Sequence, residues 1–360
     1  MTKTWTDASH TPITTRKQRI QRLAIVLIIV LGMYLCSSTL GRVLSSAAPY
    51  IPRRARCLAT APVKKVQKTF KLPSGDEVPG IALGVWQASP GEVGTAVETA
   101  LKIGYRHIDG AWIYRPKAGP QEKKPAAPPN KTGITPKLWN TFHAPEDVES
   151  ALDDSLAKLG TSYVDLYLMH WPVAQRSDGS VNTDLTENPY PTWQAMEKLV
   201  EKGKARNIGV SNFNIRRLTN LTSNKLKHIP AVNQVELNFW NPQPELVKWA
   251  LEHNVILEAY SPLGSNRQVS ESLNVPEVKE IAEKLCISPA QVLISWQAQR
   301  GNIVLPKSVT PSRIDENLHV FEIPEDLFNK LEKAATSHPP KRVVDPSKGW
   351  GVDIFDELDE

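Results

Sequence analysis

From residue 70 onward one pattern recurs, in which a short apolar run precedes a stretch whose apolar residues fall at helical spacing. Eight runs have the length of strands, at 81–86, 105–109, 134–138, 164–170, 205–211, 231–237, 255–260 and 303–306. Because strands that are apolar on both faces and separated by helices require a parallel sheet, the pattern predicts an α/β fold. Eight such units close into a (β/α)8 TIM barrel. An open doubly wound sheet is disfavoured, since no GxGxxG follows an early strand.

The clearest helical stretch follows the third apolar run. Its apolar side recurs at the spacing of one helix face, through Val148, Ala151, Leu152, Ser155, Leu156 and Leu159. Asp147 stands near its start and Gly160 just after its end, as at many helix termini. The same spacing predicts helices over 92–102, 192–202, 244–254 and 289–300.

The first 66 residues differ from this repeat and form a leader. No acidic residue occurs between Asp7 and Asp76, and residues 23–41 are uncharged between Arg22 and Arg42. This candidate membrane segment is long enough to span a bilayer as a helix. It predicts a membrane anchor, while a cleaved secretory signal and a mitochondrial transit peptide remain alternatives because the following residues are rich in Ser and Arg. The domain division is then leader 1–66, barrel 67–336 and tail 337–360.

Charge and cysteine usage exclude several classes of function. The net charge of +5 arises from the basic leader, and the chain has no motif that reads nucleic acid. Three cysteines lie far apart without a CxxC pair, which predicts no metal site and suits a reducing compartment. The combined prediction is a membrane-anchored protein whose barrel lies in a reducing, cytoplasmic compartment, with a mitochondrial location as the alternative.

Four polar side chains stand at or just after predicted strand ends: Asp109, Tyr114, Lys137 and His170. In a parallel barrel these ends meet at one mouth, where ligands bind. An ammonium beside a phenol lowers the pKa of the phenol, and a carboxylate can hold the ammonium in place. With an imidazole to orient a carbonyl oxygen, the set predicts an enzyme that transfers a proton to a carbonyl compound.

Several long motifs in the same order resemble the aldo-keto reductase family between residues 70 and 331. They are LGVWQ (83–87), GYRHIDGAWIY (104–114), KLWNTFHAPEDVESALDDSLAKLG (137–160), DLYLMHWP (165–172), IGVSNFN (208–214), VNQVELN (232–238), AYSPLGS (259–265) and LPKSVTPSRIDENL (305–318). The resemblance implies reduction of an aldehyde or ketone by hydride transfer from a nicotinamide cofactor, with Tyr114 as general acid. The implied partners are small molecules, and the implied state is a monomer or weak oligomer.

The resemblance also implies which residues bind the cofactor. Ser211, Asn212 and Gln234 would bond the nicotinamide carboxamide, with Tyr260 stacked on the ring. Ser261, Leu263 and Ser265 would lie along the pyrophosphate, and Glu316 and Asn317 beside the adenine. Two cations and a hydroxyl, Lys307, Ser308 and Arg313, suit the 2'-phosphate that distinguishes NADPH from NADH.

Five aromatic residues near strand ends are candidates for an apolar substrate pocket: Trp86, Trp139, Trp171, Phe239 and Trp240. The tail, with Trp350 and Phe355, is a candidate cover for the mouth, as the resemblance implies.

One segment departs from the family pattern. Residues 115–136 are rich in proline, which breaks helices, so the second outer helix is predicted to be missing. This leaves a second hypothesis, in which the barrel binds NADPH as a regulatory or partner-binding subunit with little turnover.

Overall fold

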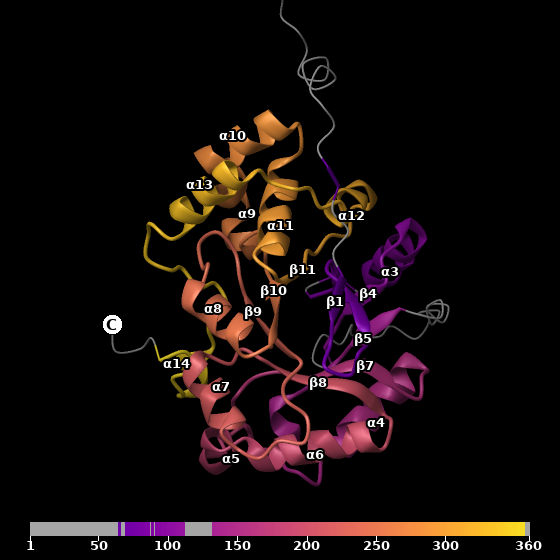
Figure 1. Cartoon of the computed structure of the whole chain (residues 1–360). Helices are drawn as coiled ribbons and strands as arrows, with labels where there is room; N and C mark the ends of the chain where they lie inside the picture. Colours follow the sequence, from indigo (N-terminus) through magenta and orange to yellow (C-terminus); the bar gives the residue numbers. More distant parts are fainter. Residues whose placement is uncertain (1–63, 66–68, 87, 90, 112–131, 357–360) are drawn as a thin grey trace, which may run out of the picture. The chain divides into compact units, whose positions relative to one another are not determined.

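The computed structural model describes residues 64–65, 69–86, 88–89, 91–111 and 132–356, all within the unit Val63–Glu360 (Figure 1). The leader up to residue 63, the candidate membrane segment 23–41 and Tyr114 lie outside the described residues. So does most of 115–136, where the second outer helix was predicted to be missing.

Parallel strands form the centre of the described residues. In chain order they are β3 (Leu83–Gly84), β4 (His107–Asp109), β5 (Gly133–Thr135), β6 (Lys137–Leu138), β7 (Val164–Met169), β8 (Ala205–Ser211), β9 (Val232–Glu236), β10 (Ile256–Tyr260) and β11 (Ile303–Leu305). β3, β4 and β5 pair in sequence, and β6 to β11 form a second run of neighbours. Bridges from Ile81 to Val304 and from Gly84 to Lys307 join the first strand to the last. The prediction of a (β/α)8 barrel is confirmed.

A proline divides the third barrel strand into β5 and β6. Pro136 has no N–H to donate to a neighbouring strand, so the ladder is interrupted there. Its carbonyl still accepts from the N–H of Leu168 at 3.2 Å, which keeps the two pieces in line along β7. The run predicted at 134–138 is therefore one barrel strand with a break.

Helices surround the strands (Figure 1). Those that follow barrel strands are α3 (Glu92–Ile103), α4 (Val148–Leu159), α5 (Thr183–Glu187), α6 (Tyr190–Glu201), α7 (Ile215–Thr222), α8 (Pro244–Glu252), α9 (Ser265–Asn274), α10 (Pro276–Leu285), α11 (Pro289–Gln299) and α12 (Pro311–Leu318). After them come α13 (Glu325–Ala335) and α14 (Ser347–Trp350), and the 3-10 turn η2 (Asn140–Phe142) precedes α4. In α4 the left-handed Gly160, at φ 70°, ends the helix where the sequence predicted.

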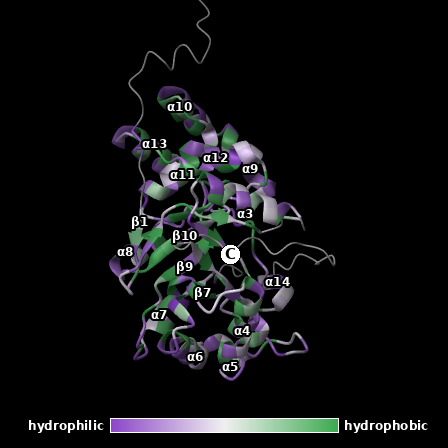
Figure 2. Cartoon of the chain, turned by 90° about the vertical axis from the view of Figure 1, so that its right-hand side faces the viewer, coloured by the Kyte–Doolittle hydropathy of each residue, from purple (hydrophilic) through white to green (hydrophobic). Residues whose placement is uncertain are grey.

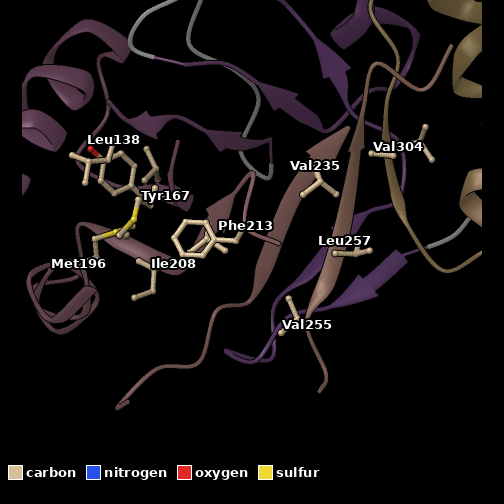
Figure 3. Close-up of a cluster of buried hydrophobic side chains, with 14 of the residues drawn as sticks. Leu138, Tyr167, Met196, Ile208, Phe213, Val235, Val255, Leu257 and Val304 are labelled. Carbon is tan, nitrogen blue, oxygen red and sulfur yellow. The ribbon is translucent and has the colours of Figure 1, made fainter. Parts of the chain in front are cut away.

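The main hydrophobic core fills the space between strands and helices. Figure 2 shows the strands mainly in the colour of hydrophobic residues. Figure 3 shows part of this core, where Tyr167 and Ile208 from neighbouring strands lie near Met196 of α6. Because the strands are covered on their outer faces, their apolar runs are continuous, which is why the sequence revealed them.

A short antiparallel hairpin precedes the barrel. It consists of β1 (Thr69–Lys71) and β2 (Glu77–Pro79), joined through the turn at residues 73–75. Leu72 and Val78 are buried with Leu166, Leu168 and Ile303 from the barrel strands. The hairpin thus covers the floor of the barrel and leaves the opposite end for ligands.

The predicted membrane anchor requires correction. In the described part of the chain, no helix is both long enough and apolar enough to cross a bilayer. The transmembrane prediction, and the membrane location based on it, are therefore withdrawn.

Candidate active site

A buried ion pair joins the last residue of β4 to the first residue of β6, near the carboxyl end of the third barrel strand. The Nζ atom of Lys137 lies 2.6 Å from Oδ1 of Asp109 and donates a second hydrogen bond, of 2.7 Å, to the carbonyl of Gly110. Lys137 is 1% exposed and Asp109 5% exposed. Parallel strands bring these residues together, as the sequence predicted. A cation so fully buried requires strong partners, and these two oxygens supply them.

His170 follows β7, and its backbone N–H donates to the carbonyl of Leu138 at 3.0 Å. Its ring meets Trp139 edge to face at 5.3 Å and stacks on Trp171 at 6.1 Å between centroids. Burial, with the nearby charge of Lys137, holds the pKa of His170 well below its ordinary value. The imidazole is therefore neutral at physiological pH and suited to orient a carbonyl oxygen.

A cluster of hydroxyls and amides lies at the ends of β8, β9 and β10. Asn212 donates through Nδ2 to the carbonyl of His170 at 2.9 Å and to Oγ of Ser211 at 3.1 Å. The hydroxyl of Ser211 donates to the carbonyl of Gln234 at 2.7 Å, and that of Tyr260 to Oδ1 of Asn212 at 2.8 Å. The left-handed φ of 64° at Asn212 shows that this network fixes an uncommon backbone conformation.

The structure adds Glu258 to the site, a residue that the sequence analysis missed. It is fully buried on β10, and its Oε2 accepts from Nε2 of Gln234 at 2.8 Å. The same Nε2 donates to Oδ1 of Asp109 at 2.8 Å. Burial, then the charge of Asp109, raises the pKa of Glu258 to about 7. The signal in the sequence was a lone acid inside the apolar run 255–260, since glutamate is almost never buried without a partner.

The loops after β10 and β11 form the side of the site predicted to hold phosphates. Ser261 and Ser265 both have left-handed φ, at 48° and 57°, and Ser265 opens α9. Lys307 and Arg313 are exposed, and neither forms an ion pair within the described residues. Ser308 is buried and accepts from the N–H of Thr310 at 3.1 Å, just before α12. Leu263 lies in the loop before α9, and Glu316 and Asn317 are in α12.

The predicted substrate aromatics separate into two groups. Trp139 and Trp171 lie beside His170 and meet Trp350 of the tail edge to face, at 6.3 Å and 5.3 Å. Phe239 and Trp240 instead belong to the cluster beneath α10, α11 and α13, and both contact His338. Trp86 is 36% exposed after β3. The structure therefore brings only Trp139 and Trp171, among the five, against the catalytic imidazole candidate.

Two buried charges hold the tail, and neither was singled out in the sequence. The carboxylate of Glu236, at the end of β9, accepts from the N–H groups of Val343 and Val344 at 2.8–3.1 Å. The guanidinium of Arg217, on α7, donates to the carbonyls of Asp353 and Ile354 at 3.1 and 3.2 Å. The tail thus packs through Trp350 against Trp139 and Trp171, the two aromatic residues beside His170.

Comparison with known proteins identifies the family. Residues 80–336 match the model of the aldo/keto reductase family. Glycerol 2-dehydrogenase (NADP(+)) of Saccharomyces cerevisiae is 41% identical over 299 residues, which cover 78% of this chain and 95% of that protein. Human aldo-keto reductase family 1 member A1 is 42% identical over 301 residues, which cover 76% of this chain and 92% of the relative.

Solved structures agree. The aldose reductase of Schistosoma japonicum has a TM-score of 0.70 at 35% identity, covering 81% of this chain and 99% of that one. A Bombyx mori aldo-keto reductase in complex with NADP has a TM-score of 0.70 at 31% identity, covering 82% and 99%. The chain belongs to the aldo-keto reductase family.

Proposed function

We propose that this chain reduces an aldehyde or ketone to the alcohol with NADPH as hydride donor, acting as a monomer or weak oligomer. The observation that carries the proposal is the buried Lys137–Asp109 pair at the barrel mouth, with Nζ 2.6 Å from Oδ1, next to neutral His170. An ammonium there favours ionisation of a phenol beside it, and an imidazole there can hold a carbonyl oxygen.

The donor set fits a nicotinamide cofactor. Ser211, Asn212 and Gln234 present hydroxyl and amide groups from adjacent strand ends, and a carboxamide needs both donors and acceptors. Tyr260 supplies an aromatic ring beside them. When bound, NADPH supplies the hydride, which no side chain of the site can deliver. Lys307 and Arg313, which are exposed and form no ion pair among the described residues, suit its 2'-phosphate.

Tyr114 is the proposed proton donor, by the resemblance of its motif, although it lies outside the described residues. Asp109 would hold Lys137, Lys137 would make the phenol more acidic, and His170 would orient the substrate oxygen. We further propose that residues 67–336 form the reductase barrel, 1–66 a leader and 337–360 a tail that helps select the substrate. No observation favours the barrel without turnover that segment 115–136 had suggested.

Loss of NADPH absorbance with the purified full chain and a panel of aldehydes and ketones tests this function. We expect turnover in the wild type, and a fall of at least about a hundredfold in kcat for Tyr114→Phe because general acid catalysis is lost. NADPH affinity, measured by quenching of protein fluorescence, should remain nearly unchanged in that variant. Full activity in Tyr114→Phe would reject the assignment of the acid, and tight NADPH binding without turnover on any carbonyl would reject the enzyme.

A further inference from the structure

The amide of Gln234 is held between two buried carboxylates. Its Nε2 donates to Oδ1 of Asp109 on one side and to Oε2 of Glu258 on the other, each at 2.8 Å. A primary amide has only two N–H bonds, so both are committed. The carbonyl oxygen Oε1 is then the one polar atom of this side chain left for a ligand, and no described residue donates to it.

The strand register produces this arrangement. Gln234 on β9 pairs directly with Glu258 on β10 and with Ser211 on β8. Residues opposite each other in paired strands point to the same face, so the three side chains form one row across the sheet. The row places Glu258 one strand beyond the residues proposed to bond the carboxamide.

We propose that Glu258 is a positioning residue, which fixes Gln234 with its carbonyl oxygen toward the cofactor so that the site recognises the N–H of the nicotinamide carboxamide. The inference rests on the proposed function, because it takes NADPH as the ligand. Glu258 itself touches neither the cofactor nor the reacting atoms in this account. It acts by occupying an N–H that would otherwise be free to turn toward the ligand.

Asp109 alone would hold the amide of Gln234 less firmly. Its Oδ1 already accepts from Nζ of Lys137 at 2.6 Å, so Gln234 shares that oxygen with a cation. Among the described residues no cation bonds Glu258 directly: Nε2 of His107 lies 3.8 Å from its other oxygen, and Lys137 acts on it only through its charge. Gln234 is therefore the one described hydrogen-bond partner of a fully buried acid.

Burying such an acid reduces the stability of the folded protein. Desolvation raises the pKa of Glu258 to about 7, and an apolar side chain of similar size would fill the same space without that cost. Residues that reduce stability in this way are concentrated at functional sites. The cost therefore supports a role in ligand recognition rather than in packing.

The test compares NADP+ with its 3-acetylpyridine analogue, in which a methyl ketone replaces the carboxamide and removes its N–H donors. Dissociation constants are measured by fluorescence quenching on the full chain. The wild type should bind NADP+ about tenfold more tightly than the analogue, the worth of one buried hydrogen bond. Glu258→Met should lose most of that preference by weakening NADP+ alone, whereas Glu258→Gln, which retains a carbonyl acceptor, should keep it.

Glu197→Met is the matched control for removal of a buried acid. Glu197 is 3% exposed on outer helix α6 and accepts from the N–H groups of Lys227 and His228, so its loss should affect stability but not the ratio of the two affinities. Glu258→Leu supplies a second apolar variant if Glu258→Met does not fold. In a Gln234→Leu background, replacing Glu258 should change the ratio no further.

The outcomes are distinct. A wild type that binds neither dinucleotide would reject the proposed function itself. Equal wild-type affinity for both ligands, or an equal loss of both in Glu258→Met, would overturn the role of Glu258 while leaving the function intact. Loss of the preference in Glu258→Gln would also overturn it, because that variant retains an acceptor.

Discussion

At the scale of single residues, Glu258 couples folding to pH. Burial raises its pKa from 4.5 to about 7, and the groups that face it are Asp109, His107, Gln234 and, through its charge, Lys137. Because the folded state favours the protonated acid, the stability that Glu258 contributes is complete below about pH 4.5 and is lost as pH rises through 7. The full loss corresponds to about 3 kcal/mol of unfolding free energy.

Glu258→Gln should therefore gain stability relative to the wild type on going from pH 5 to pH 8, by up to about 3 kcal/mol. Urea unfolding of both proteins at the two pH values measures this difference. His107, whose pKa is lowered by burial, is present in both proteins. A difference that does not change with pH would mean that Glu258 keeps the same charge throughout this range.

Lys307 and Arg313 carry the prediction on cofactor choice. Both are exposed, and neither forms an ion pair in the described chain. Glu92 is near enough for the charge of Lys307 to lower its pKa, but its carboxylate bonds Ser89, so both cations can meet a phosphate. The double replacement Lys307→Ala and Arg313→Ala should weaken NADPH by a hundredfold or more, about 3 kcal/mol, while NADH changes little. Titration of both cofactors against protein fluorescence gives the two constants, and equal losses would show that these cations do not meet the 2'-phosphate.

At the scale of elements, the tail is bonded both by a buried arginine and by an exposed one, and we expect the two to contribute unequally to its stability. Arg217, whose side chain is 5% exposed, donates to the carbonyls of Asp353 and Ile354, while Arg216, at 51%, pairs with Asp356. Arg217→Met should speed hydrogen exchange of the tail by tenfold or more, because breaking buried charged hydrogen bonds costs about 1–3 kcal/mol. Arg216→Met should change it little, since exposed pairs contribute about 0–1 kcal/mol. Similar acceleration of hydrogen exchange in both variants would mean that the exposed pair of Arg216 holds the tail as firmly as buried Arg217 does.

Elements also show what could be predicted from the sequence. Apolar runs revealed the barrel strands because both their faces are covered, and even the run broken by Pro136 was found. The floor hairpin was missed because its strands have three residues each, too few for a pattern. The Asp109–Lys137 pair was predicted from strand ends, whereas Glu258 and Arg217 owe their roles to burial by distant segments, which a linear pattern does not record. Phe239 and Trp240 were named from their position near a strand end, and that position did not reveal that they pack with residues of α10, α11 and α13.

At the scale of the whole molecule, a closed ring of strands leaves little room to absorb an added atom. Gly209 lies on β8, where a Cβ would stand 2.5 Å from the carbonyl oxygen of Val232 and 2.7 Å from Cδ2 of Leu168. Both neighbours belong to the adjacent barrel strands, so relief requires β8 to move against β7 or β9. An edge strand of an open sheet could shift outward, but in a closed barrel a shift of one strand also displaces the strands paired with it.

Gly209→Ala should therefore lower the unfolding free energy by about 1–3 kcal/mol or more, as overpacked cores do, and should weaken NADPH by displacing Ser211 from Gln234. Gly94→Ala is the matched control. Gly94 lies in α3 with no atom within 4 Å of an added Cβ, so the same change should stabilise the protein by up to about 1 kcal/mol. Thermal unfolding and cofactor titration measure both effects. If Gly209→Ala melted like the wild type and bound NADPH normally, β8 would be able to move without disturbing Ser211, and the inference that a shift passes to the neighbouring strands would be wrong.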